Sequence, residues 1–257
     1  MKNHVTLLSR GISISGAAAG AAIGALGGPM GTVLGAATGG AIVEMSKVLL
    51  DDFANRFLSQ KEERRIAGVA ALAIDQIQGR LLWETRRSDD FFDGTPDRPS
   101  PAEEIFEGVL LSAKQEHEDL KLPYLANFYS NLPFRPDVLR SEANYVLAVA
   151  ETLTYEQFKI LGLMSQAARF PIRRDQWPDP KSISPHSSVL AQQLLHLYER
   201  HLILSYEDDG EISSGIYDID LIVPSFLSLS ASGKRFVDLL GLRTIPEDEL
   251  KRLAENL

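Results

Sequence analysis

The side chains best suited to metal binding or proton transfer are the five histidines, and their spacing does not bring them together. A zinc site of the His-Glu-x-x-His kind needs two histidines four residues apart on one helix face. His196 and His201 are five residues apart and fall off a shared face. The run from Glu116 to Asp119, which contains His117, could hold a metal, although such a run at a helix end is usually a solvated face. The five histidines are His4, His117, His186, His196 and His201.

Nucleophilic and phosphate-binding motifs are also incomplete. The segment GISISG misses the Gly-x-Ser-x-Gly nucleophile elbow by one position, because Ser15 stands where glycine is required. No Gly-x-x-x-x-Gly-Lys-Ser/Thr phosphate loop occurs, and the absence of cysteine excludes disulfides and thiolate metal sites. We therefore expect a protein that is not an enzyme, with no catalytic residue, no metal and no cofactor.

The most regular spacing in the chain belongs to glycine. Residues 11–43 contain no charged side chain, and glycine recurs there every fourth residue in two series that are one register apart. Members of one series lie about 40° apart around a helix, so they form a face without side chains. Such a face lets a second helix approach closely, as in small-xxx-small packing in membranes. The first series is Gly16, Gly20, Gly24 and Gly28, and the second is Gly27, Gly31, Gly35 and Gly39.

A helical hairpin is the geometry that we favour for this segment. One continuous helix would reach roughly 50 Å, more than the ~30 Å hydrocarbon core of a membrane requires. The change of register falls at Gly27, Gly28 and Pro29, where proline removes a backbone donor and the glycines permit a reversal. The break leaves two limbs of about 14 to 16 residues, each too short to span a membrane alone.

Three outcomes remain open for residues 11–43. The glycine faces can pack in a membrane or between copies of the chain, they can form a buried hairpin within the protein, or the tract can be a flexible linker. Each glycine costs ~1 kcal/mol relative to alanine in a helix in water, so ordering needs lipid or a fitted partner. A linker has no reason to keep period four or to interleave aliphatic residues such as Ile23, Leu26 and Leu34.

Charge and composition bound the partners and the compartment. The formal net charge of −9 predicts no general electrostatic affinity of the whole molecule for nucleic acid or anionic lipid. The N-terminal tract is mainly Ala and Gly, unlike the compact Leu, Ile or Val block of a secretory signal. We expect a cytoplasmic protein with conditional or peripheral association with the inner membrane. Its expected partners are further copies of itself, membrane lipid on activation and a regulatory protein.

After the glycine tract the sequence predicts helices. Amphipathic spacing runs from Glu44 to Arg87 without proline, as one long helix or as two with a break near Ser59. Ser100, followed by proline and two glutamates, has the form of a capped helix start. Thr154 and Gln157 have the spacing of a capping box, which predicts a helix after Thr154.

The C-terminal residues predict a winged-helix-like module. A helix from Ser187 or Ser188 to Arg200 precedes a strand over 201–206, a turn, a returning strand over 212–223 and a helix capped by Ser230. The turn carries acids, whereas a DNA-binding wing supplies Lys or Arg to phosphates. We therefore expect this module to recognise protein rather than nucleic acid.

Together the elements predict a mainly α protein in three parts. Residues 1–46 are the glycine-zipper hydrophobic segment, folded as a Gly/Ala-rich helical hairpin. Residues 47–136 form a helical middle domain, in which we expect Trp83 to lie in the core. Residues 137–257 form the winged-helix-like domain with a small β-hairpin.

Two stretches carry a resemblance to a known family. The sequence LPYLANFYSNLPF, followed by EANYVLAVAETLTYEQFKIL and combined with the Gly/Ala-rich N-terminal segment, resembles bacterial Abi-alpha-type abortive-infection proteins and related phage-defence effectors. The resemblance covers about residues 50–165. It implies a bacterial protein whose activation harms the host membrane or arrests growth during phage infection. It transfers no functional residue, because the family has no defined site motif.

Two functions are consistent with these features. The first is a membrane-active, self-oligomerising effector that inserts residues 11–43 and packs its glycine faces into a pore. The second is a soluble protein-binding or sensing module, in which the glycine-rich hairpin does not insert. The glycines that would pack in the pore are Gly16, Gly20, Gly24, Gly31, Gly35 and Gly39.

Overall fold

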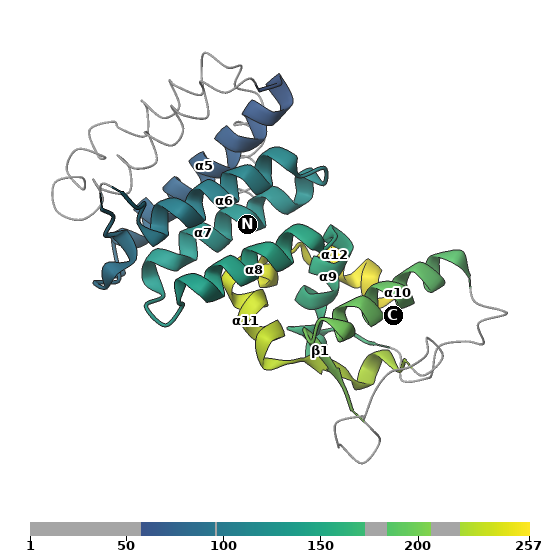
Figure 1. Cartoon of the computed structure of the whole chain (residues 1–257). Helices are drawn as coiled ribbons and strands as arrows, with labels where there is room; N and C mark the ends of the chain where they lie inside the picture. The colour runs from purple at the N-terminus through teal and green to yellow at the C-terminus, as the bar shows by residue number, and fades with distance from the viewer. Residues whose placement is uncertain (1–57, 96, 173–183, 207–221) are drawn as a thin grey trace. The chain divides into compact units, whose positions relative to one another are not determined.

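The computed structural model describes residues 58–95, 97–172, 184–206 and 222–257, and this part of the chain is mainly helical with one small antiparallel sheet (Figure 1). The mainly α class predicted from the sequence is confirmed at this level. The described residues divide into two compact units between Thr152 and Leu153. The expected N-terminal hairpin lies outside the described residues.

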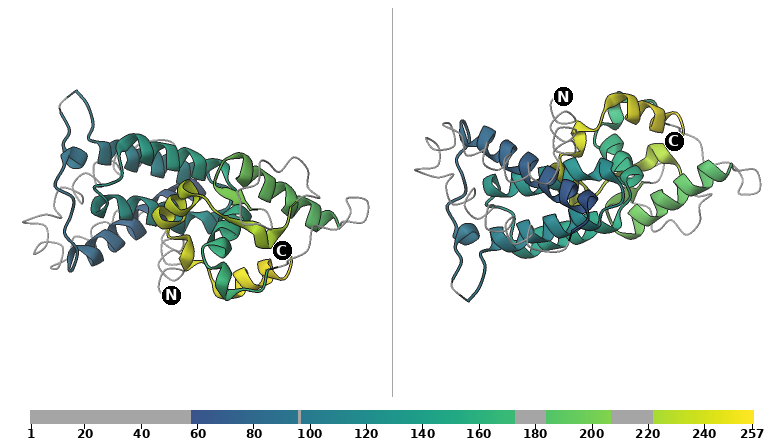
Figure 2. Two further views of the ribbon diagram at one scale, coloured as in Figure 1. Left: turned by 90° about the horizontal axis from the view of Figure 1, so that it is seen from below. Right: turned by 90° about the horizontal axis from the view of Figure 1, so that it is seen from above.

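Among the described residues, the first unit contains four helices, the first two of which are separated by residues 82–100. They are α5 (Gln60–Leu81), α6 (Pro101–Gln115), α7 (Leu122–Asn131) and α8 (Arg140–Thr152). The 3-10 turns between them are η2 (Asp90–Phe92), η3 (Asp119–Lys121) and η4 (Leu132–Phe134). α5 packs against α6 and α7, and α6 packs against α7 and α8. Figure 2 shows these blue and teal helices side by side in two further views.

Apolar side chains at helical spacing fill the core of this unit. Leu72 on α5, Phe106 on α6 and Phe128 on α7 are each at most 2% exposed. The ring of Phe106 stacks on that of Tyr129 with 4.3 Å between the ring centroids. Burial of such large side chains against three helices stabilises the unit by roughly 1.5–3 kcal/mol for each side chain.

Polar caps fix where the helices begin. Three of the described helices begin with a capping box. In each box the hydroxyl of the cap residue accepts a hydrogen bond from the backbone N–H of the residue three positions later, and the side chain of that later residue accepts one from the backbone N–H of the cap residue. The pairs are Ser59 with Glu62, Ser100 with Glu103, and Thr154 with Gln157. The predicted caps at Ser100 and Thr154 are confirmed, and α5 begins directly after Ser59.

In the part of the second unit that the structure describes, four helices accompany the sheet. The helices are α9 (Tyr155–Met164), α10 (Pro185–Glu199), α11 (Ala231–Leu240) and α12 (Glu247–Ala254). Strand β1 (Ile203–Ser205) pairs antiparallel with β2 (Leu227–Leu229), with Leu204 opposite Ser228. The 3-10 turns are η5 (Ala167–Arg169), η7 (Pro224–Phe226) and η8 (Leu242–Thr244). Phe158 of α9 and Phe236 of α11 meet edge to face in the core.

The pairing partner of β1 differs from the one expected from the sequence. β1 pairs with Leu227–Leu229, a strand that was not predicted from the sequence. The expected returning strand over 212–223 lies almost wholly outside the described residues, and the described Ile222 and Val223 are not part of a strand. Ser230 caps α11 as predicted, because its hydroxyl accepts the N–H of Gly233 at 2.9 Å. α10 begins at Pro185, slightly earlier than predicted, because Ser184 caps it.

Candidate functional site

The residues singled out for membrane insertion and oligomerisation all lie outside the described part of the chain. This holds for every member of the two glycine series and for the break at Gly27, Gly28 and Pro29. The hairpin and its glycine faces therefore stay predictions. Within the described residues, no helix combines the length and the apolar character needed to cross a membrane.

The described histidines do not converge on one site. The side chain of His117 is 88% exposed. His196 lies on α10, where its Nε2 atom accepts a hydrogen bond from Arg200 Nε at 3.0 Å. His201 follows the C-terminal end of α10, has a positive φ of 54° and is exposed. This left-handed conformation is usually taken by glycine after a helix, so His201 carries local backbone strain.

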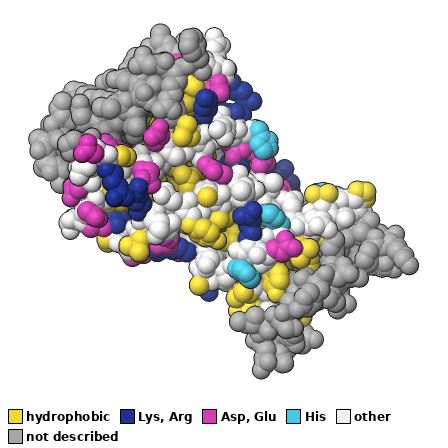
Figure 3. All heavy atoms as spheres, viewed as in Figure 1, with side chains coloured by type: hydrophobic (Ala, Val, Ile, Leu, Met, Phe, Trp, Pro, Cys, Tyr) yellow, Lys and Arg dark blue, Asp and Glu magenta, His cyan; other side chains and the backbone are white. Residues whose placement is uncertain are grey.

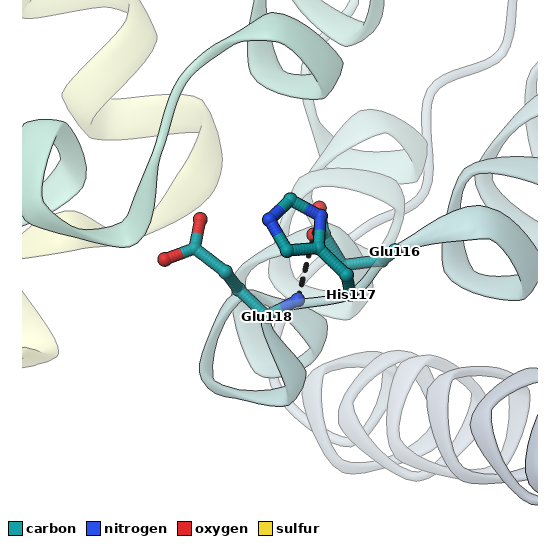
Figure 4. A group of neighbouring side chains, drawn as sticks. All are labelled: Glu116, His117 and Glu118. Carbon is teal, nitrogen blue, oxygen red and sulfur yellow. Dashed lines mark hydrogen bonds and ion pairs between the residues drawn. The ribbon is translucent and has the colours of Figure 1, made fainter.

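One group of three side chains in the described residues could supply ligands to a metal ion. The ligand atoms of Glu116, His117 and Glu118 lie within 4.8 Å of one another. Figure 4 shows the His117 ring between the two carboxylates, with the Glu118 backbone N–H bonded to Glu116. Carboxylate and imidazole ligands suit a divalent transition metal. Glu116 already has partners for both carboxylate oxygens, so a metal would have to displace one of them.

The second partner of Glu116 is a buried lysine. Lys121 Nζ lies 2.5 Å from Glu116 Oε2, and the two side chains are only 2% and 6% exposed. We expected this run to be a solvated face, and for Glu116 that prediction is wrong. The 3-10 turn η3 brings residue 121 back over residue 116, a geometry that helical periodicity does not reveal. The arrangement indicates a structural ion pair rather than a metal centre.

A groove of about 590 Å³ lies in the first unit beside the loop of residues 88–100. Residues of the loop line the groove together with Pro101 at the start of α6, Arg140 at the start of α8 and Leu139 directly before α8. Figure 3 shows acidic and basic side chains next to one another at the end of the first unit that carries this loop. Leu139 is 66% exposed in the groove, so the lining presents an aliphatic side chain among charges.

The base of this groove is held in place by Arg87. Its guanidinium is 4% exposed, donates to both carboxylate oxygens of Asp89 and to the carbonyl oxygen of Val138, and lies 4.3 Å from the ring centroid of Phe91. The hydrogen bonds from Arg87 lower the pKa of Asp89 below its ordinary value. The groove is thus preformed rather than assembled from loose side chains.

The exposed face of α10 forms a second groove, of about 390 Å³, in the second unit. It is lined by Gln157 of α9 and by Val189, Gln192, Gln193 and His196 of α10, among others. Thr154 Oγ1 and Gln193 Oε1 lie 2.8 Å apart, and this hydrogen bond joins the start of α9 to α10. The lining mixes aliphatic with neutral polar side chains and contains Glu199 but no lysine or arginine, which suits contact with a polypeptide more than contact with phosphates.

Trp83 corrects one expectation about the core. Its side chain is 72% exposed, and the neighbouring Leu82 is 62% exposed. α5 ends at Leu81, so Trp83 leaves the helical periodicity that would have turned it inward. Trp177, the other tryptophan, lies outside the described residues.

Comparison of the chain with protein families, with curated proteins and with solved structures gives no match in any of the three.

Proposed function

We propose that the protein is a membrane-active, self-oligomerising effector of the bacterial phage-defence or abortive-infection type. The observation that carries this proposal is the double glycine series within the uncharged residues 11–43. Two glycine faces allow close helix packing, which replaces the hydrophobic effect as the driving force between helices in lipid. The Ala and Gly content makes insertion marginal, which suits a segment that is stowed first and released later.

Features of the described residues support separate roles for the two folded units and for residues 11–43 within this proposal. Each unit has its own apolar core, and α5 has a satisfied N-terminal cap directly after Ser59. A capped, packed helix can stay folded while the residues before it change surroundings. In the proposed mechanism the two units therefore act as a scaffold that controls release of residues 11–43 in a cytoplasmic protein, with further copies of the chain and membrane lipid as partners.

Substitution of glycines on the two faces tests the packing step. We expect Gly20→Leu and Gly35→Leu to reduce dye leakage from liposomes and toxicity in cells, because leucine blocks close approach. Leucine also raises the hydrophobicity of the segment, so simple partitioning into lipid predicts the opposite change. The matched controls are Ala18→Leu and Ala37→Leu, which add leucine away from the glycine faces. Undiminished leakage in the glycine variants would count against the proposal.

A second candidate function uses the C-terminal unit. The order α9, α10, β1, β2 and α11 is compatible with a winged-helix-like arrangement, and the groove on α10 favours a protein partner for it. In this alternative the chain is a soluble binding or sensing module, and the N-terminal hairpin does not insert. Cell fractionation separates the two candidates. A chain found only in the soluble fraction, with function unchanged after removal of residues 1–43, favours the binding module.

A further inference from the structure

Three aspartates and three arginines line the groove beside residues 88–100, and the excess of acid belongs to the loop rather than to the lining. Two of its three arginines are matched by carboxylates, since Arg87 pairs with Asp89 and Arg140 pairs with Glu104. The loop itself contains four aspartates and one arginine. Asp90 and Asp93 line the groove and are exposed. An occupant that brings positive charge is therefore favoured over an anion.

The apolar part of the groove sets a second requirement. Leu139, directly before α8, is 66% exposed, and Pro99 and Pro101 also line the groove. Burying Leu139 requires an aliphatic side chain from the occupant. The groove thus fits a polypeptide segment that combines cations with aliphatic residues and lacks acids.

The chain contains one such segment next to its glycine series. Residues 2–10 read KNHVTLLSR, with Lys2 and Arg10 at the ends and Val5, Leu7 and Leu8 between them. In a protein of net charge −9, residues 1–43 contain no aspartate or glutamate. The chain from residue 11 to the start of the described part is long enough to reach any point of the first unit.

We infer that the groove beside residues 88–100 is the docking site of the basic N-terminal residues 2–10. Lys2 and Arg10 meet Asp90 and Asp93, and an aliphatic side chain covers Leu139. The regulatory consequence rests on the proposed function: a docked N-terminus holds the adjoining glycine segment away from lipid. An anionic membrane surface competes with the groove for the same two cations and so favours release.

Disulfide trapping tests the docking without any membrane. The protein contains no cysteine, so the pair Leu8→Cys and Leu139→Cys is the sole pair of thiols in the full-length chain. We expect mild oxidation to give an intramolecular disulfide, detected by mass spectrometry of the purified protein. The matched control pairs Leu8→Cys with Leu120→Cys, because Leu120 is 60% exposed in the same unit at the other end of α6.

Charge exchange makes the test specific. Asp90→Lys with Asp93→Lys should slow trapping roughly fivefold, as expected from the loss of two exposed ion pairs. Adding Lys2→Glu and Arg10→Glu should restore it. Trapping no faster than in the Leu120 control, or a disulfide only between two chains, would overturn the inference. Because no lipid is present, either result is independent of whether the protein permeabilises membranes, and circular dichroism checks that each variant is folded.

Discussion

Gly233 lies so close to Leu202 that a Cβ atom at residue 233 would stand 1.9 Å from the Leu202 carbonyl oxygen. The same carbonyl accepts the backbone N–H of Ser230 at 3.1 Å. Ser230 in turn caps α11 through Gly233 and donates from its hydroxyl to the carbonyl of His201. These contacts hold the start of α11 against the residues that precede β1. The fold of the second unit therefore requires glycine, which has no side chain, at residue 233.

Gly233→Ala should therefore destabilise the protein by about 3 kcal/mol or more, because the neighbour is backbone and cannot move aside cheaply. The matched control is Gly79→Ala on α5, where an added Cβ meets nothing within 4 Å. Alanine there should stabilise by roughly 0.5–1 kcal/mol through helix propensity. Urea unfolding followed by circular dichroism measures both changes. Equal stability of the two variants would contradict the close approach at Gly233.

The buried pair of Lys121 and Glu116 leads to a prediction of non-additive stability. Lys121→Met alone should cost about 3–5 kcal/mol, because it leaves the Glu116 carboxylate buried without its ammonium partner. The double variant with Glu116→Leu should recover most of that loss. Lys251→Ala, which breaks an exposed pair with Glu247, should change stability by less than about 1 kcal/mol. Additive losses in the double variant would rule out a shared buried pair.

Tyr129 carries a buried hydroxyl that has no hydrogen-bond partner. Tyr129→Phe removes this group and should raise the free energy of unfolding by about 1 kcal/mol. Burial also raises the pKa of Tyr129 above its ordinary value. Because the raised pKa belongs to the folded state, the hydroxyl stays protonated there while the unfolded chain ionises, so the free energy of unfolding falls as the pH rises above the ordinary tyrosine pKa of about 10.

The measurement for Tyr129 is urea unfolding of both proteins at neutral and alkaline pH. Tyr145→Phe serves as the control, because Tyr145 is 58% exposed and its replacement should leave stability nearly unchanged. A loss of stability in Tyr129→Phe at neutral pH would mean that the hydroxyl does have a partner in solution.

The ion pair of Arg87 and Asp89 at the base of the groove makes the stability of the protein depend on pH. Hydrogen bonds from Arg87 hold the pKa of Asp89 below its ordinary value, so this carboxylate contributes stability above its ordinary pKa. The contribution disappears as pH falls through the lowered folded-state pKa. NMR titration of the carboxyl carbons should show Asp89 titrating below the ordinary aspartate pKa, and Arg87→Met should raise the pKa of Asp89 toward that ordinary value. An Asp89 signal that is unmoved in the variant would show that Arg87 is not the cause.

Local signals in the sequence predicted several helix caps correctly, although they missed Ser184 as the cap of α10. When a Ser or Thr stands three residues before a Glu or Gln, the two side chains together satisfy two backbone N–H donors at the start of a helix. Ser100 and Thr154, which we predicted as caps, both cap helices in this way. Strand β2 escaped prediction because it is three residues long and pairs with β1 across a long separation in sequence. Nothing local distinguishes Leu227–Leu229 from an extended entry to a helix.

The candidate sites were less predictable because they depend on long-range geometry. The burial of Lys121 and Glu116 follows from the turn η3, and lysine is rarely buried, so composition argues against it. The groove at residues 88–100 combines a loop with two helix starts that lie far apart in sequence. The glycine series is the opposite case. Its pattern is clear in the sequence, but its residues lie outside the described part of the chain.

Dye release from liposomes on addition of the purified full-length protein tests the proposed function most directly. We predict that leakage rises more steeply than in direct proportion to protein concentration, because several chains must pack through their glycine faces. We also predict that leakage is lower in Gly20→Leu and Gly35→Leu. Removal of residues 1–43 should abolish it. Liposomes that stay intact while the protein is bound to them, or leakage that survives removal of residues 1–43, would contradict a pore built from the glycine segment.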